Sequence, residues 1–200
     1  SKFKRGGNIK NDTIIIVGIG ALGSHICANI VADNREERKI TVMDFDKVEN
    51  RNLQGTQFYT SEVKDYFKTD GLQYLIYKVF KKEINFINEK LIEANVGLLS
   101  NYDMVIDACD NFDARSAITE ACRDIPCVHL GFGKYTWSIL WNEGYQPPET
   151  MTNFDLCELP GASSFVHMVA AISSSVIQEY LTTGGKKEFC GNRFSIREIE

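Results

Sequence analysis

The sequence has little of what membrane-spanning, nucleic-acid-binding or secreted proteins need. Its apolar runs, of which Ile14–Val17 is typical, are far shorter than the roughly 20 residues of a membrane-spanning helix. Lys and Arg number 22 against 27 Asp and Glu, and the resulting net charge of −5 argues against a broad basic surface for nucleic acid. No signal-peptide pattern opens the chain. We therefore expect a cytoplasmic protein that binds neither membranes nor nucleic acid.

Cysteine pairs with metal-binding spacing are also missing. The chain has 6 cysteines and no C-x-x-C pair, so no zinc is expected. The cysteines are Cys27, Cys109, Cys122, Cys127, Cys157 and Cys190. Four of them lie in apolar or helix-like segments, which is typical of reduced, mostly buried thiols in a cytoplasmic protein.

Length and composition indicate a single globular domain over residues 1–200. The chain is 44% hydrophobic and 24% charged, which is the ordinary globular mixture. A chain of this size buries roughly 70% of the surface that its unfolded form exposes, so it needs no disulfide or metal staple. Three of the 4 prolines fall at about 144–161, where we expect a loop or flap rather than a regular element.

The first elements form a strand–helix–strand unit. A run of β-branched residues at 13–17 predicts a strand, and residues 39–43 predict a second one. Between them, apolar residues recur every four positions over 21–32, which predicts an amphipathic helix. Such a unit has a right-handed crossover between parallel strands.

The same alternation continues along the chain. Helices are expected at 72–80, 113–124 and 165–181, and strands at 83–86 with 91–92, 104–108, 127–130 and 135–141. This order predicts an α/β fold, namely a Rossmann-like, doubly wound, mainly parallel sheet with helices on both faces.

A glycine motif stands at the first strand–helix junction. Gly18, Gly20 and Gly23 have the spacing G-x-G-x-x-G, which permits a tight turn and lets phosphate approach the amides at the helix N-terminus. Asp44 ends the second strand and suits a pair of ribose hydroxyls. These residues fit NAD, ATP or a tight turn that binds no ligand.

The loop behind Asp44 favours one of these readings. The segment DFDKVENRNLQ at 44–54 resembles the D-x-D-x-V … (S/R)-N-L-(N/Q)-R-Q signature of ThiF/MoeB/HesA-type adenylyltransferases, which belong to the ubiquitin-activating-enzyme-like superfamily. An NAD dehydrogenase has no use for so polar a loop directly behind its ribose-binding acid.

Three further segments match this family in its own order. Residues 59–68 are similar to its Y-T-E-E-D-I-G-x-P-K segment, although the Gly and Pro before the lysine are missing. Residues 105–115 resemble V-(I/L)-D-(A/C)-(T/C)-D-N-x-x-x-R, and residues 127–133 resemble the following strand and glycine turn. The resemblance covers residues 12 to 133 well and the helix at 165–181 more loosely.

The resemblance implies an ATP- and Mg²⁺-dependent enzyme. Its reaction would be adenylation of the C-terminal glycine of a small β-grasp, ubiquitin-like or sulfur-carrier protein ending in Gly-Gly, with release of pyrophosphate. The resemblance places catalytic groups at Arg51, Lys68 and Asp110, with Asp110 as the metal ligand. It places ATP-binding groups at Gly18, Gly20, Gly23, Asp44, Asp46, Asn52, Lys68 and Asn111.

Two of these residues have simpler explanations when taken alone. Lys68 fits a solvated lysine at a helix end, and Asp110 fits the N-cap of the helix that follows it. The sequence also departs from the family, because Gly55 stands where the family has an arginine. Arg51 lies in the same loop and is the candidate substitute. Arg5 is the sole arginine before Thr13.

The resemblance also implies paired active sites, and so a homodimer or a partner subunit. The apolar helix at 165–181 and the strand carrying Trp137 and Trp141 are the candidate contact surfaces. Family members that form a thioester or persulfide place a cysteine in the loop after the second half of the sheet. Cys157 is the candidate at that position, with a packed thiol as the alternative.

Two other functions remain open at this point. An NAD-dependent Rossmann oxidoreductase would explain the glycine turn and Asp44 but not the remaining motifs. A scaffold subunit without ATP turnover would explain Gly55 and the short segment before Thr13.

Overall fold

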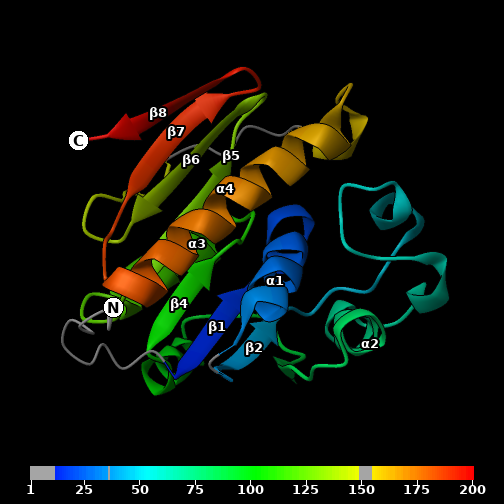
Figure 1. Cartoon of the computed structure of the whole chain (residues 1–200). Coiled ribbons are helices and arrows are strands. Elements are labelled where there is room, and N and C mark those ends of the chain that lie inside the picture. Colours follow the sequence, from blue (N-terminus) through cyan, green and yellow to red (C-terminus); the bar gives the residue numbers. More distant parts are fainter. Residues whose placement is uncertain (1–11, 36, 149–154) are drawn as a thin grey trace, which may run out of the picture.

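A single mixed sheet organises the molecule. The computed structural model describes residues 12–35, 37–148 and 155–200. Eight strands follow the order β3-β2-β1-β4-β5-β6-β7-β8 (Figure 1). The strands are β1 Thr13–Val17, β2 Lys39–Met43, β3 Asn85–Ile87, β4 Met104–Asp107, β5 Cys127–Phe132, β6 Thr136–Trp141, β7 Glu188–Asn192 and β8 Ser195–Ile199. The first five are parallel to one another, and β6, β7 and β8 are antiparallel to their neighbours.

Helices cover both faces of this sheet. They are α1 Ala21–Asp33, α2 Lys68–Phe80, α3 Phe112–Ala121 and α4 Ala162–Thr183. Short 3-10 helices are η1 Asn50–Leu53, η2 Ser61–Val63, η3 Val96–Asn101 and η4 Leu156–Glu158. In Figure 1, α1 and α4 cross in front of the sheet and α3 lies behind it. The predicted Rossmann-like α/β architecture is confirmed.

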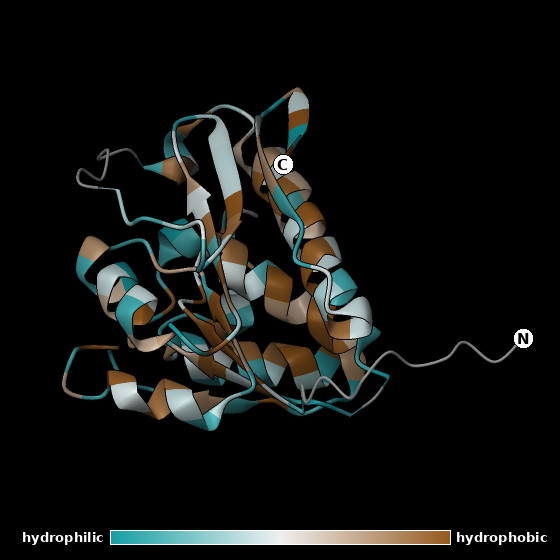
Figure 2. Cartoon of the chain, turned by 90° about the vertical axis from the view of Figure 1, so that its left-hand side faces the viewer, coloured by the Kyte–Doolittle hydropathy of each residue, from teal (hydrophilic) through white to brown (hydrophobic). Residues whose placement is uncertain are grey.

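Strand β1 shows how the sequence builds two cores. Ile14 and Ile16 face the core under α1, α2 and α4, whereas Ile15 and Val17 face the core under α3 and η3. Successive side chains of a strand point to opposite faces, so a strand covered on both sides needs a continuous apolar run. Figure 2 shows the apolar residues gathered on the strands and on the helix faces turned toward them.

The carboxyl ends of β1, β2 and β4 lie at the same level of the sheet. Val17 lies opposite Met43 of β2 and opposite Asp107 of β4. The segments that leave these strands therefore emerge side by side. This register brings the glycine turn, Asp44 and the segment before α3 to one place.

Several predicted boundaries differ from the structure. Helix α2 begins at Lys68, four residues before the expected 72, because its first turn carries no apolar repeat. Helix α3 ends at Ala121 instead of 124, and residues 91–92 lie outside a strand. The β7–β8 hairpin has no counterpart in the prediction. Its residues are half-buried or exposed, so they lack the apolar alternation that marks a strand.

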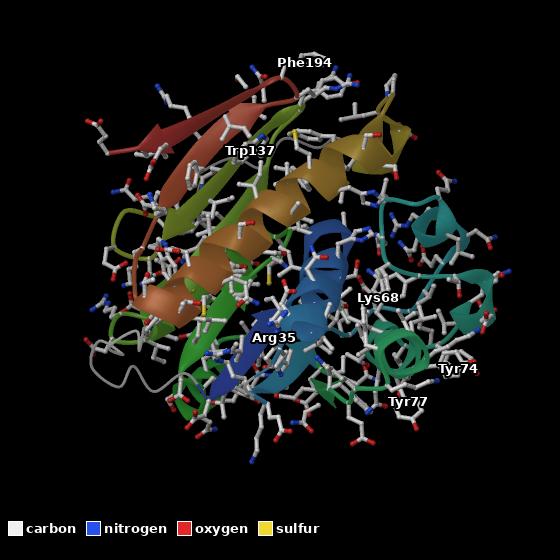
Figure 3. The ribbon with its side chains drawn as sticks, in the orientation of Figure 1. Arg35, Lys68, Tyr74, Tyr77, Trp137 and Phe194 are labelled. Atoms are coloured by element: carbon white, nitrogen blue, oxygen red, sulfur yellow. The ribbon has the colours of Figure 1, made fainter. Side chains whose placement is uncertain are left out.

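The proposed contact surfaces on β6 and α4 are corrected by the structure. Trp137 and Trp141 are 3% and 1% exposed, and the Trp141 ring lies 4.7 Å from that of Tyr180 on α4. These tryptophans and the apolar face of α4 therefore belong to the core of this chain. Figure 3 labels Trp137, which lies on β6. Within the described ranges, no helix is both long and apolar enough to span a bilayer.

Candidate active site

A cavity of about 1010 Å³ opens at the carboxyl ends of β1, β2, β4 and β5. In open α/β sheets this edge is where ligands bind. The cavity is lined by Gly18 and Gly20 from the glycine turn, by Asp44, Asp46, Arg51 and Asn52 from the loop after β2, and by Lys68, Asp110 and Asn111. The structure thus brings together all but one of the predicted ATP-binding and catalytic residues. The exception is Gly23, the third residue of α1, which does not line the cavity.

The three glycines have three different structural roles. Gly18 has a φ of +85°, and a Cβ there would lie 2.8 Å from the carbonyl oxygen of Ala108. A Cβ on Gly23 would lie 1.9 Å from the carbonyl oxygen of Gly18, so a side chain at Gly23 would break the turn. A Cβ on Gly20 would meet nothing within 4 Å. Gly20 is the N-cap of α1 without a side-chain cap, which leaves the first amides of α1 open to the cavity.

Asp44 ties the end of β2 to the glycine turn. Its Oδ2 accepts a hydrogen bond from the Ile19 amide at 2.9 Å, and its Oδ1 accepts one from the Asp46 amide at 2.9 Å. Each carboxylate oxygen has a second lone pair, so Asp44 can still accept from a ligand hydroxyl. The carboxylate is therefore held rigidly at the cavity wall.

Lys68 opens α2 but is not solvated. It is 7% exposed, and its Nζ lies 3.2 Å from Oδ2 of Asp46. Figure 3 shows Lys68 turned toward the body of the protein, whereas Tyr74 and Tyr77 of the same helix point outward. The explanation of Lys68 as a solvated helix-end lysine is wrong, because its ammonium is buried against the cavity.

Asp110 is not the N-cap of α3, which was the simpler explanation of this residue. The N-cap of α3 is Asn111, whose Oδ1 accepts a hydrogen bond from the Ala114 amide at 2.8 Å. Asp110 is exposed at the cavity wall. Among the residues that the structure describes, no group of three or more His, Cys, Asp or Glu gathers as a metal cluster. Mg²⁺ takes only one or two protein carboxylates and keeps waters and substrate oxygens as its other ligands, so a single carboxylate such as Asp110 is compatible with it.

Gly55, which stands where the family has an arginine, lies in the loop just after η1. Gly55 has a φ of +88°, and its carbonyl accepts a hydrogen bond from Ser163 Oγ of α4 at 2.9 Å. A side chain at this position would be strained and would meet α4. Arg51 lines the cavity, but its Nε lies 2.9 Å from Glu49 Oε2 at the surface. Asn52 is buried and accepts a hydrogen bond from the Glu49 amide, which holds this loop in place.

Sequence reasoning missed an ion pair in the cavity wall. Arg115 and Asp107 are 6% and 0% exposed, and Nη1 lies 3.7 Å from Oδ2. The Arg115 guanidinium also donates to the carbonyls of Cys109 and Leu130. Burial acts to raise the pKa of Asp107, but Arg115 and His129 outweigh it, so this pKa lies below its ordinary value. The D-N-x-x-x-R match contained Arg115, but no local pattern showed that it is buried.

The structure tests the predicted burial of the cysteines but not the predicted role of Cys157. Cys27, Cys109, Cys122 and Cys127 are buried free thiols, as expected. Burial raises the pKa of Cys27 to about 12. Cys157 lies in η4, but its side chain is outside the described part of the chain, as is Arg5.

The sheet order, the glycine turn and the cavity at the strand ends define a Rossmann-like α/β protein. A family model described as the ThiF family matches residues 4–197, and the chain belongs to this family.

Relatives with assigned names agree with this membership. The chain is 27% identical, over 61% of its length and 32% of the relative's, to a probable molybdopterin-synthase adenylyltransferase from Porphyra purpurea. It is 29% identical, over 56% of its length and 42% of the relative's, to a sulfur carrier protein adenylyltransferase from Thermus thermophilus. The chain thus spans less than half the length of these relatives.

Solved structures agree with the fold. Escherichia coli MccB matches with a TM-score of 0.75 and 14% identity, over 96% of this chain and 63% of that one. PaaA matches with a TM-score of 0.72 and 19% identity, over 96% and 64%.

Proposed function

We propose that this protein activates the C-terminal glycine of a small ubiquitin-like or sulfur-carrier protein by ATP-dependent adenylation. The observation that carries the proposal is the convergence of the glycine turn, Asp44, Lys68 and Asp110 on one cavity. Membership of the ThiF family, together with relatives named as adenylyltransferases, supports the same reaction. The partner would be a β-grasp protein ending in Gly-Gly, and residues 1–200 would act as one ThiF-type domain.

The proposed mechanism gives each group a distinct task. The amides at the start of α1 bind phosphate oxygens, and Asp44 and Asn52 orient the nucleoside. Asp110 would hold Mg²⁺, which neutralises phosphate charge when bound. The partner's carboxylate oxygen attacks the α-phosphorus, and the bond to the β-phosphate oxygen breaks with release of pyrophosphate. Lys68 moves from Asp46 to the phosphates and stabilises the charge that develops there.

Arg51 and Cys157 have further roles in this proposal. Arg51 would replace the arginine that the family has at position 55, which requires it to leave Glu49. Cys157 would act after the adenylate exists, in a thioester or sulfur-transfer step.

A scaffold without turnover is the second candidate. Its support is the pairing of Arg51 with Glu49 and the packing of Gly55 on α4. Binding of ATP with Mg²⁺ that is not followed by exchange of label between pyrophosphate and ATP would favour it.

ATP binding offers a direct test of the site. Asp44→Ala should weaken ATP binding by about 1.5–3 kcal/mol, since it removes a charged acceptor from the ribose hydroxyls. Gly20→Ala should weaken it as well, because a methyl group would enter the space beside the first amides of α1. Calorimetric titration with ATP and Mg²⁺ measures both effects. Asp124→Ala, at an exposed residue outside the cavity lining, is the control. Unchanged affinity in both site variants would remove the ATP assignment.

We further propose that the active protein is a homodimer or a complex with a partner subunit, because the family resemblance implies paired active sites. For a homodimer, light scattering at tens of micromolar should report about twice the chain mass of 22.6 kDa. For a complex with a partner subunit, the measured mass should rise only after that subunit is added. A monomer with full exchange activity would contradict this proposal.

A further inference from the structure

Beyond the nucleotide groups, the cavity wall contains a buried polar cluster centred on His129. The His129 Nδ1 lies 2.7 Å from Oδ2 of Asp107, and its Nε2 lies 2.7 Å from Oδ1 of Asn142. The orientation of the Asn142 amide is set on its other side, where Nδ2 donates to the carbonyls of Thr119 and Cys122. Both ring nitrogens of His129 therefore face oxygen atoms of neighbouring side chains, which fixes the plane of the ring.

Tyr145 separates this histidine from the cavity. Its ring is stacked on His129, with centroids 3.8 Å apart and an angle of 8° between the planes. Tyr145 lines the cavity, whereas His129 is 1% exposed and does not. The Tyr145 hydroxyl accepts a hydrogen bond from Arg115 Nη1 at 3.0 Å. Its ring position and its hydroxyl position are thus both set by buried neighbours.

The Tyr145 hydroxyl retains an unused proton. In the hydrogen bonds of residues 12–35, 37–148 and 155–200 it serves as an acceptor and never as a donor. Burial raises the pKa of this phenol, against the opposing effect of Arg115, so the hydroxyl stays protonated at neutral pH. Tyr145 can therefore donate its remaining proton into the cavity.

Arg115 links this hydroxyl to the reacting end of the cavity. The same guanidinium that donates to Tyr145 also donates through Nε to the carbonyl of Cys109, the residue before Asp110. The guanidinium also polarises the Tyr145 hydroxyl, because a hydroxyl that accepts a hydrogen bond from a cation becomes a stronger donor. A carboxylate placed at Tyr145 would therefore accept a hydrogen bond from a hydroxyl that itself accepts one from the Arg115 guanidinium.

The cavity continues past Asp110 in a form that suits a peptide tail. This end is lined by Gly131, Thr136 and Ser138, by Tyr145, Gln146 and Pro148, and by Asp155 and Leu156. Apart from Asp155, these lining residues are uncharged, and three of them are small residues of β5 and β6. We propose that Tyr145 binds the C-terminal carboxylate of the acyl substrate and aligns it for attack on the α-phosphorus. This inference rests on the proposed function and identifies a residue that selects a free carboxylate.

The test compares a carboxylate with its neutral analogue. The probes are a synthetic peptide ending in Gly-Gly with a free C-terminus and the same peptide as its C-terminal amide. Each is titrated by calorimetry into the full chain saturated with Mg²⁺ and α,β-methylene-ATP, whose bridging carbon prevents pyrophosphate release. The wild type should bind the free peptide at least about tenfold more tightly than the amide. Tyr145→Phe, which keeps the ring on His129, should reduce this ratio to near one.

Two further measurements separate this inference from the proposed function. Affinity for α,β-methylene-ATP should be the same in the wild type and in Tyr145→Phe, and loss of nucleotide binding by the wild type would refute the proposed function instead. Tyr180→Phe, at a buried tyrosine on α4 outside the cavity, should keep the wild-type preference. With ATP binding intact, a wild type that does not prefer the carboxylate, or an undiminished preference in Tyr145→Phe, would overturn the role of Tyr145.

Discussion

Replacing Lys68 or Asp110 with alanine should abolish exchange of label between pyrophosphate and ATP. The assay contains Mg²⁺, ATP and a small ubiquitin-like protein ending in Gly-Gly. Each variant loses an electrostatic group at the reacting phosphates, and one such group contributes about 10²–10³ in rate. Lys68 is held beside the cavity by Asp46, and Asp110 is kept free by the Asn111 cap. Neither loss is therefore expected to be replaced by a neighbouring side chain.

Matched variants separate this effect from general damage. Lys78→Ala removes an exposed lysine on the same helix that pairs with Glu62, and it should leave exchange intact. Cys157→Ala should also leave exchange intact, because a cysteine acts only after the adenylate has formed. Arg51→Ala should cost as much as Lys68→Ala if Arg51 substitutes at position 55. Loss of exchange in Cys157→Ala alone would show that the cysteine acts before the adenylate forms, contrary to the proposed order. ATP binding without exchange for every Gly-Gly partner tried would favour the scaffold.

The second large effect concerns stability. Asp107→Asn should lower the free energy of unfolding by about 3–5 kcal/mol, because it leaves the buried Arg115 guanidinium without its carboxylate. For a chain of this size, roughly 2–4 °C of Tm is lost per kcal/mol, so calorimetry should show a fall of about 6–20 °C. Asp124→Asn, at an exposed position, should change stability by less than about 0.5 kcal/mol.

The pH dependence of this difference has a defined sign. The pKa of Asp107 is lower in the folded protein than its ordinary value, which is about 3.9 in an unfolded chain. Its carboxylate therefore stabilises the fold above about pH 4, and this contribution is lost as pH falls through the lower, folded pKa. The Tm difference between the wild type and Asp107→Asn should thus be constant near neutral pH and should shrink in acid. A difference that grows in acid would show that the carboxylate is not the stabilising group.

Much of the fold was predictable because its signals are local. The strand at 13–17, the G-x-G-x-x-G turn and Asp44 all occur within about 30 residues, and each signal depends on chain neighbours. Continuous apolar strands between amphipathic helices then define a Rossmann-like sheet. The sequence alone therefore determined the first half of the sheet, the glycine turn and the resemblance to adenylyltransferases.

The tertiary structure decided which of several plausible roles each side chain takes. Lys68 is buried because the loop after β2 folds back over it, and Trp137 faces inward because α4 covers β6. The cluster of Asp107, His129 and Tyr145 joins three separate segments through side-chain contacts. Such contacts depend on strand order and register, which periodicity along the chain does not encode. The β7–β8 hairpin could not be predicted from the sequence, because a strand at an exposed sheet edge needs no apolar alternation.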